Sequence, residues 1–120
     1  MLTRYRKLSS FVTKDGSEIR ELMHPAKHAC RHQSLAEARV APGAATTLHR
    51  HRTSEELYHI TAGEGVMTLG GRRFAVQPGD TVAIAPGTAH RIENTGRGTL
   101  VVLCCCSPPY SDQDTELLPS

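Results

Sequence analysis

The sequence predicts an all-β barrel or sandwich built from short strands. Glycine and proline recur at short intervals along the 120 residues, as expected where tight turns join strands. The segments between them are short, and several alternate apolar and polar residues, which is typical of strands. No segment of ten or more residues has a convincing helical pattern. Short, regularly spaced strands favour an all-β fold.

The N-terminal third contains one ambiguous segment and one clear strand. In residues 17–22, SEIREL, the apolar Ile19 and Leu22 are three positions apart, which slightly favours a helical turn over a strand. Residues 34–40, SLAEARV, alternate. Both alanines and Val40 therefore share one face of a predicted strand.

Five more strands are expected towards the C-terminus. They are GVMTL (65–69), RRFAVQ (72–77), DTVAIA (80–85), HRIENT (90–95) and TLVVLCC (99–105). The pair Gly70-Gly71 between the first two can supply positive φ angles, which predicts a hairpin turn. The last segment, SPPYSDQDTELLPS, has adjacent prolines and little alternation, so we expect an extended tail lying on the body.

Composition argues against several classes of protein. The formal net charge of +2 is too small to indicate a nucleic-acid or membrane-surface partner. No apolar run has membrane-spanning length, and the N-terminus lacks a secretory signal. Cys30 and the run Cys104–Cys106 make a poor disulfide framework. We therefore expect a cytoplasmic protein with free thiols.

The stretch HRHRTSEELYHITAG (49–63) indicates a metal site. His49 and His51 face the same side if this segment is extended. After a turn, Glu56 can return on the next strand with Tyr58 on its face, and His90 in APGTAHRIEN offers a third imidazole. Three imidazoles and a carboxylate suit a divalent transition metal.

The spacing of these residues resembles the cupin family. The first family motif fits Gly43, His49, His51, Glu56 and Gly63, with four residues between the second histidine and the glutamate. The second motif fits Gly79, Gly87, His90 and Asn94, with alanine at position 85 where the family usually has proline. The two motifs are 15 residues apart (64–78), and the resemblance covers roughly residues 34–107.

The resemblance implies a double-stranded β-helix, a jelly-roll barrel, spanning residues 34–107. Residues 1–33 then form an N-terminal extension that packs on the barrel or on a dimer partner, and residues 108–120 form the tail. It also implies that His49, His51, Glu56 and His90 bind one divalent metal ion, which could be Fe, Mn, Ni, Co, Cu or Zn. Glu55 is the rival carboxylate, but its spacing to the following glycine fits the motif less well.

Two functions from different classes follow from the resemblance. The first is a metal-dependent enzyme acting on a small oxygenated organic molecule, with dioxygenase-like chemistry ahead of isomerase, cyclase or lyase chemistry. Glu56 and Tyr58 are the acid–base candidates, although Tyr58 fits a core position better. The second is a non-catalytic cupin that binds or senses a sugar or another metabolite. The family also implies a homodimer.

The remaining histidines and cysteines fit structural roles better. His24, His28 and His32 lie beside Pro25, which disfavours a helix, and we interpret them as loop histidines. Strand parity turns His59 away from the metal. Cys104 and Cys106 share one strand face and Cys105 the other; buried apolar packing is the expected role, and lining the cavity is the alternative. Asn94 is expected to hold a turn.

Overall fold

The computed structural model describes residues 1–119 and is almost entirely β-structure, which confirms the predicted fold class. One short 3-10 helix, η1 (Tyr5–Lys7), precedes the strands. The strands are β1 (Ser10–Val12), β2 (Glu18–Met23), β3 (Ser34–Val40), β4 (His49–His51), β5 (Glu55–Ala62), β6 (Gly65–Leu69), β7 (Arg72–Val76), β8 (Thr81–Ile84), β9 (His90–Asn94), β10 (Leu100–Ser107) and β11 (Thr115–Leu117).

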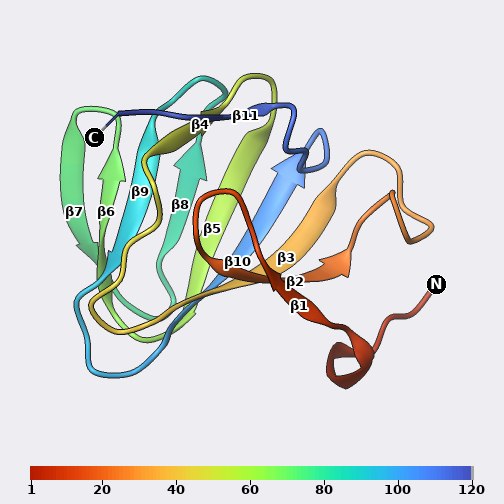
Figure 1. The fold of residues 1–120 in the computed structure, drawn as a ribbon, viewed down its shortest axis with the longest axis horizontal. Coiled ribbons are helices and arrows are strands. Elements are labelled where there is room, and N and C mark those ends of the chain that lie inside the picture. Colours follow the sequence, from red (N-terminus) through yellow and green to blue (C-terminus); the bar gives the residue numbers. More distant parts are fainter. Residues whose placement is uncertain (120) are drawn as a thin grey trace.

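Two antiparallel sheets form the barrel (Figure 1). The six-stranded sheet has the order β1-β2-β3-β10-β5-β8, and the five-stranded sheet has the order β11-β4-β9-β6-β7. Neighbours in each sheet are often far apart in sequence: β3 and β5 both pair with β10. No helix among the described residues 1–119 is long and apolar enough to cross a membrane.

Strands near both ends of the chain join these sheets. β1 and β2 form a hairpin that extends the six-stranded sheet beyond β3, and β11 pairs with β4 at the edge of the other sheet.

The helical turn predicted for residues 17–22 is wrong, because this segment belongs to the strand Glu18–Met23. Pairing with β1 and β3 satisfies its backbone groups on both sides, and this outweighs the spacing of two apolar side chains.

The core lies between the sheets and follows the alternation of each strand. In β5, Glu56, Tyr58 and Ile60 are buried while Glu55 and Leu57 are exposed. The face of β3 that carries Ala38 and Val40 is also buried, as the alternation predicts. The largest fully buried side chains are Ile60, Met67, Ile84, Leu100, His90, Val102 and Asn94. Two of these seven are polar, and both belong to the sequence motifs.

The predicted turns are present where they shape the barrel. Gly70 has φ +57° in the β6–β7 hairpin. Asn94 holds a turn, as expected: its amide donates to the carbonyl oxygens of Val40 and Gly98, and its own oxygen accepts from the backbone N–H of Gly96. This buried amide therefore stabilises the barrel end.

Candidate metal centre

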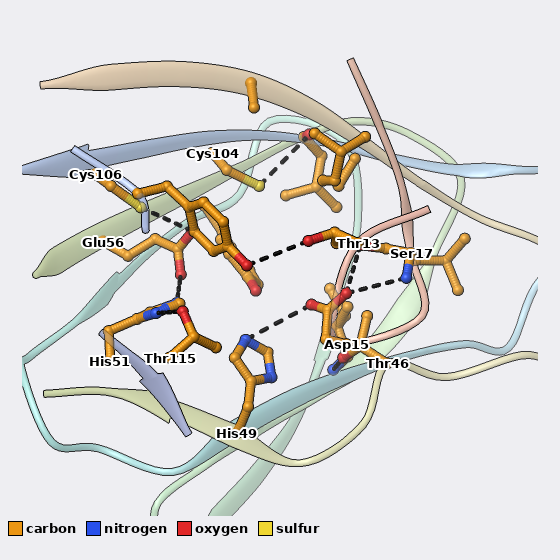
Figure 2. A pocket seen from close by; sticks show the side chains of 18 of the residues that line it. Thr13, Asp15, Ser17, Thr46, His49, His51, Glu56, Cys104, Cys106 and Thr115 are labelled. Atoms are coloured by element: carbon orange, nitrogen blue, oxygen red, sulfur yellow. Dashed lines mark hydrogen bonds and ion pairs between the residues drawn. The ribbon is translucent and has the colours of Figure 1, made fainter. Parts of the chain in front are cut away.

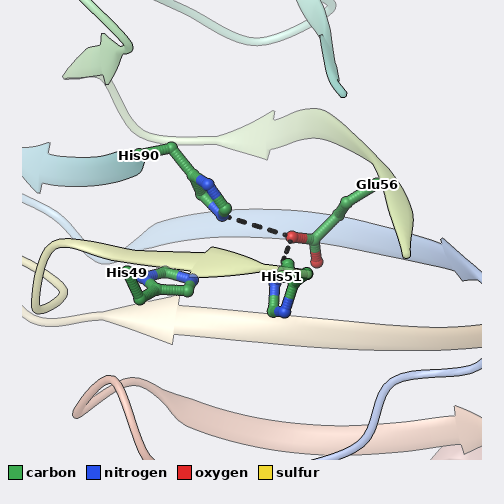
Figure 3. Close-up of side chains that lie close together, drawn as sticks. All are labelled: His49, His51, Glu56 and His90. Atoms are coloured by element: carbon green, nitrogen blue, oxygen red, sulfur yellow. Dashed lines mark hydrogen bonds and ion pairs between the residues drawn. The ribbon is translucent and has the colours of Figure 1, made fainter. Parts of the chain in front are cut away.

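Four buried side chains converge between the sheets (Figure 3). Each of His49, His51, Glu56 and His90 offers one ligand atom, and these atoms all lie within 4.8 Å of one another. Their residues are between 0% and 4% exposed. Among residues 1–119 this is the group of histidines, cysteines and carboxylates with the geometry to hold a metal ion.

Strand geometry explains why these four meet. His49 and His51 are alternate residues of β4, so both point inward. His90 begins β9 directly opposite His49 in the antiparallel register. Glu56 is the second residue of β5 and points in from the facing sheet, whereas Glu55 is exposed. The rival carboxylate therefore lies outside the cluster.

Two of the histidines are oriented by backbone carbonyls. His49 Nδ1 lies 2.7 Å from the carbonyl oxygen of Thr47, and His90 Nδ1 lies 2.9 Å from that of Thr88. A carbonyl oxygen only accepts hydrogen bonds, so each Nδ1 carries the proton. In the neutral rings, each Nε2 then keeps a free lone pair directed into the cluster.

His51 is oriented by a side chain from the C-terminal strand. Its Nδ1 lies 2.9 Å from the hydroxyl oxygen of Thr115, and this hydroxyl donates its own proton to the carbonyl oxygen of Ser111. The hydroxyl must therefore accept from His51 Nδ1. All three imidazoles consequently present an unprotonated Nε2 when neutral.

The arrangement of the four ligand groups requires a positive charge between them. Glu56 Oε1 lies 3.0 Å from His51 Nε2 and 3.4 Å from His90 Nε2, and His90 Nε2 has no hydrogen-bond partner among the described residues. With neutral rings, the lone pairs face a carboxylate oxygen, which is unfavourable without an intervening cation. A metal ion or protons on the rings would satisfy these atoms, so the residues fit a metal ion.

The pKa shifts agree with this arrangement. Burial lowers the pKa of His49, the nearby His90 lowers it further, and Asp15 opposes the shift. Burial alone would raise the pKa of Glu56, but the hydrogen bond with His51 and the proximity of His90 outweigh burial and lower the pKa to about 2. A neutral His49 imidazole and an ionised Glu56 carboxylate are the protonation states that bind metals.

A small cavity of about 60 Å³ adjoins the cluster, and Tyr58, Cys104 and Cys106 line it. Burial raises the pKa of all three, and the negative charge of Glu56 adds to each shift. The Cys106 thiol donates to Glu56 Oε2 at 3.3 Å (Figure 2). These cysteines are therefore protonated side chains beside the cluster, and the predicted sharing of one face by Cys104 and Cys106 is confirmed.

Sequence reasoning missed three residues of the site. Thr115 orients His51, Asp15 lies near His49, and Tyr110 lines the cavity. All three come from outside the motif-bearing segment, so the motif spacing contains no signal for them. The Asp15-Gly16 pair is typical of a hairpin turn, but the place where that turn docks depends on tertiary structure.

The remaining histidines do not belong to the cluster. His24 accepts from the backbone N–H of Ala26, and His28 accepts from the backbone N–H of His24, so both rings stabilise a turn. His59 faces outward and pairs with the hydroxyl of Thr81. These contacts confirm the structural interpretation of His24, His28 and His59.

The fold and the buried cluster define a small β-barrel protein with a His₃Glu centre. Residues 36–106 match the Cupin domain family. Because the match covers more than half of the chain, the protein belongs to the cupin family.

Two curated proteins are similar to this chain in sequence. An uncharacterised protein of Methanocaldococcus jannaschii is 53% identical over 116 residues, covering 97% of this chain and 93% of that protein. An oxalate-binding protein of Thermotoga maritima is 36% identical over 69 residues, 58% of this chain and 57% of that protein.

Solved structures extend the likeness in fold. A predicted oxalate decarboxylase of Thermotoga maritima superposes with a TM-score of 0.79 at 25% identity, covering 90% of this chain and 99% of that one. KdgF of a Halomonas species superposes with a TM-score of 0.81 at 17% identity, covering 94% and 97%. At this identity the second likeness concerns the fold alone.

Proposed function

We propose that this cupin is a metal-dependent enzyme acting on a small oxygenated organic molecule. The observation that carries the proposal is the orientation of the three imidazoles. Each Nδ1 is occupied by a hydrogen bond, which leaves Nε2 of each ring as the nitrogen available to a metal ion inside a buried site. This is the preorganisation that a metal centre needs.

The proposed ligands are His49, His51, Glu56 and His90, which would hold one divalent transition metal ion per chain. Fe, Mn, Ni, Co, Cu and Zn all suit this set, because imidazole and carboxylate ligands discriminate weakly among them. Four protein ligands leave one or two positions of a five- or six-coordinate ion open. Such an ion would supply Lewis-acid polarisation or dioxygen activation to a small molecule bound beside it.

Two residues around the cluster have proposed roles as hydrogen-bond donors. Tyr58 is buried beside His90, with ring centroids 5.8 Å apart, and its raised pKa keeps the phenol protonated as a hydrogen-bond donor. Cys106 holds the second oxygen of Glu56. Glu56 and Tyr58 are therefore our acid–base candidates. We propose dioxygenase-like chemistry first, and the similarity to a predicted oxalate decarboxylase supports lyase chemistry as the next class.

A non-catalytic binding function is the second candidate. The similarity to an oxalate-binding protein supports it, since the same metal centre can hold a small chelating ligand without turning it over. In either case we propose a small-molecule ligand, a homodimer and a cytoplasmic location. The four free thiols fit a reducing compartment.

Elemental analysis of protein purified without a metal-chelating column tests the metal centre. We expect about one transition metal ion per chain in the wild type and in His59→Ala, whose histidine faces outward. His51→Ala and the isosteric Glu56→Gln should lose most of it. Circular dichroism would establish that each variant is folded. Metal retained in folded His51→Ala and Glu56→Gln would refute the ligand assignment.

Turnover assays on the metal-loaded protein separate the two candidates. Oxygen consumption and product release would be followed with small hydroxy- and keto-compounds. Turnover by the wild type that is lost in Glu56→Gln would support the enzyme function. Saturable binding without turnover, at full metal occupancy, supports the binding protein and contradicts the enzyme.

A further inference from the structure

Asp15 brings a carboxylate to the metal centre from outside the barrel motifs. It lies in the turn between β1 and β2 and is largely buried, with its side chain 12% exposed. Its Oδ2 is 3.6 Å from His49 Nε2, the nitrogen that faces the cluster (Figure 2). The N-terminal hairpin therefore delivers a negative charge to the ligand-facing side of His49.

Hydrogen bonds hold Asp15 in this position. Its Oδ1 accepts from the backbone N–H and the hydroxyl of Ser17, at 3.0 and 2.7 Å. Its backbone carbonyl accepts from the N–H of Thr47 at 2.8 Å, which docks the turn onto the segment leading into β4. One carboxylate oxygen is thus used for the turn, and the other is directed towards His49.

Asp15 lies beside the metal cluster and not within it. The four ligand atoms that lie within 4.8 Å of one another come from His49, His51, Glu56 and His90. Asp15 does line the cavity beside them. A molecule bound in that cavity would therefore meet this carboxylate.

The cavity wall carries negative charge and no balancing side-chain cation. Asp15, Glu21 and Glu56 line it, and within residues 1–119 no lysine or arginine does so. The neighbouring Lys14 donates instead to the carbonyl oxygens of Asp112 and Thr115, at 3.2 and 2.7 Å. A dianionic ligand would therefore meet uncompensated negative charge beyond the metal ion.

Size and polarity also restrict the ligand. A cavity of about 60 Å³ holds a few water-sized groups, since one water needs roughly 10–15 Å³ on this measure. Neutral hydroxyls also line the cavity, among them Thr13 Oγ1 and Tyr110 Oη, which lie 3.2 Å apart. The cavity thus suits a small protic molecule that can donate a hydrogen bond to a carboxylate.

We propose that Asp15 is a specificity-determining residue that favours small neutral ligands over dianions of the same shape. The proposal rests on the metal centre proposed above and narrows its substrate class. It implies a ligand preference unlike that named for the oxalate-binding relative, because oxalate is a dianion.

Three isosteric probes test the proposal: oxalate, oxamate and oxamide carry charges of −2, −1 and 0 on nearly the same frame. Affinities would be measured by calorimetry at neutral pH with cobalt(II)-loaded wild type and Asp15→Asn. The visible absorption of cobalt would report ligand entry. Asn can still accept from Ser17, so the turn is kept.

We expect Asp15→Asn to bind oxalate at least about tenfold more tightly than the wild type, oxamate about threefold more tightly, and oxamide within about twofold. Ser17→Ala weakens the turn but keeps the carboxylate, and Glu55→Gln removes an exposed carboxylate. Both should retain the wild-type ratio of oxalate to oxamide affinity.

An unchanged ratio in Asp15→Asn, or the same change in Ser17→Ala or Glu55→Gln, would overturn the proposal. Loss of cobalt in Asp15→Asn would overturn it too, because Asp15 would then act as a ligand. If the wild type itself takes up no metal, the proposed metal centre fails. If both proteins load fully with cobalt and Asp15→Asn keeps the wild-type ratio of oxalate to oxamide affinity, the proposed role of Asp15 is refuted and the metal centre is not.

Discussion

Glu56 is the residue on which the balance of charge in the centre depends. Burial alone would raise its pKa, but without metal, protons on His51 and His90 stabilise its ionised form and lower the pKa from the ordinary 4.5 to about 2. A lowered pKa in the folded state stabilises the protein above the unfolded-state value, and this stabilisation is lost as pH falls through the folded-state value. The contribution of Glu56 should therefore disappear between about pH 4.5 and pH 2.

Chemical unfolding of metal-free wild type and Glu56→Gln across this range checks the prediction. The wild type should be more stable at about pH 4.5, by at most about 3 kcal/mol, and the two proteins should converge towards pH 2. Glu55→Gln, which changes an exposed neighbour, should track the wild type throughout. A difference that stays constant or widens on acidification would show that Glu56 is not stabilised as the carboxylate.

At the scale of the element, the corner between β5 and β6 depends on Gly63. Its φ is +81°, and a Cβ there would lie 2.7 Å from the carbonyl oxygen of Thr99 and 2.8 Å from Leu100 Cα. Both neighbours are backbone atoms of the next packed segment and have little freedom to move. This glycine therefore allows β5 to turn closely against the start of β10.

Gly63→Ala should lower the free energy of unfolding by about 2–5 kcal/mol, the sum of left-handed strain and the clash. Gly79→Ala is the matched control: Gly79 has φ +94° but open space around its Cβ position, so only the strain of about 1–2 kcal/mol applies. Urea unfolding of both variants measures the difference. Equal losses would show that the close approach at Gly63 has no energetic consequence.

For the whole molecule, an apolar strip on the outer face of the six-stranded sheet predicts a homodimer. Leu35 and Leu57 are 39% and 43% exposed, and both lie opposite Cys105, one on each neighbouring strand. Adjacent exposed apolar side chains often mark an interface. A second copy of the chain would remove this strip from water.

Light scattering at micromolar concentration should give twice the chain mass of 13.1 kDa. Leu57→Lys should shift the wild-type dimer towards monomer. Leu117→Lys changes a leucine that is 42% exposed on the other sheet, and it should leave the dimer intact. A monomeric wild type would contradict the prediction, and a dimeric Leu57→Lys would remove this face from the interface.

The sequence was sufficient to predict the fold class and the four residues of the cluster. Alternation in β3 and β5 determined which side chains point inward, because a strand repeats every two residues. The same parity brought His49 and His51 together, and the motif spacing favoured Glu56 over Glu55, which is exposed in the structure. The motif spacing then related His90 to them. These inferences hold because each depends on residues close in the chain or on a family pattern.

Only the tertiary structure decided what surrounds the cluster. Thr115 reaches His51 because β11 pairs with β4 across 64 residues of sequence, and Asp15 reaches His49 because the N-terminal turn docks onto Thr47. The strand Glu18–Met23 was also mispredicted, since its hydrogen-bond partners lie on other strands. Long-range pairing leaves no local periodicity, so the charge and hydrogen bonding around the centre became visible only in the folded chain.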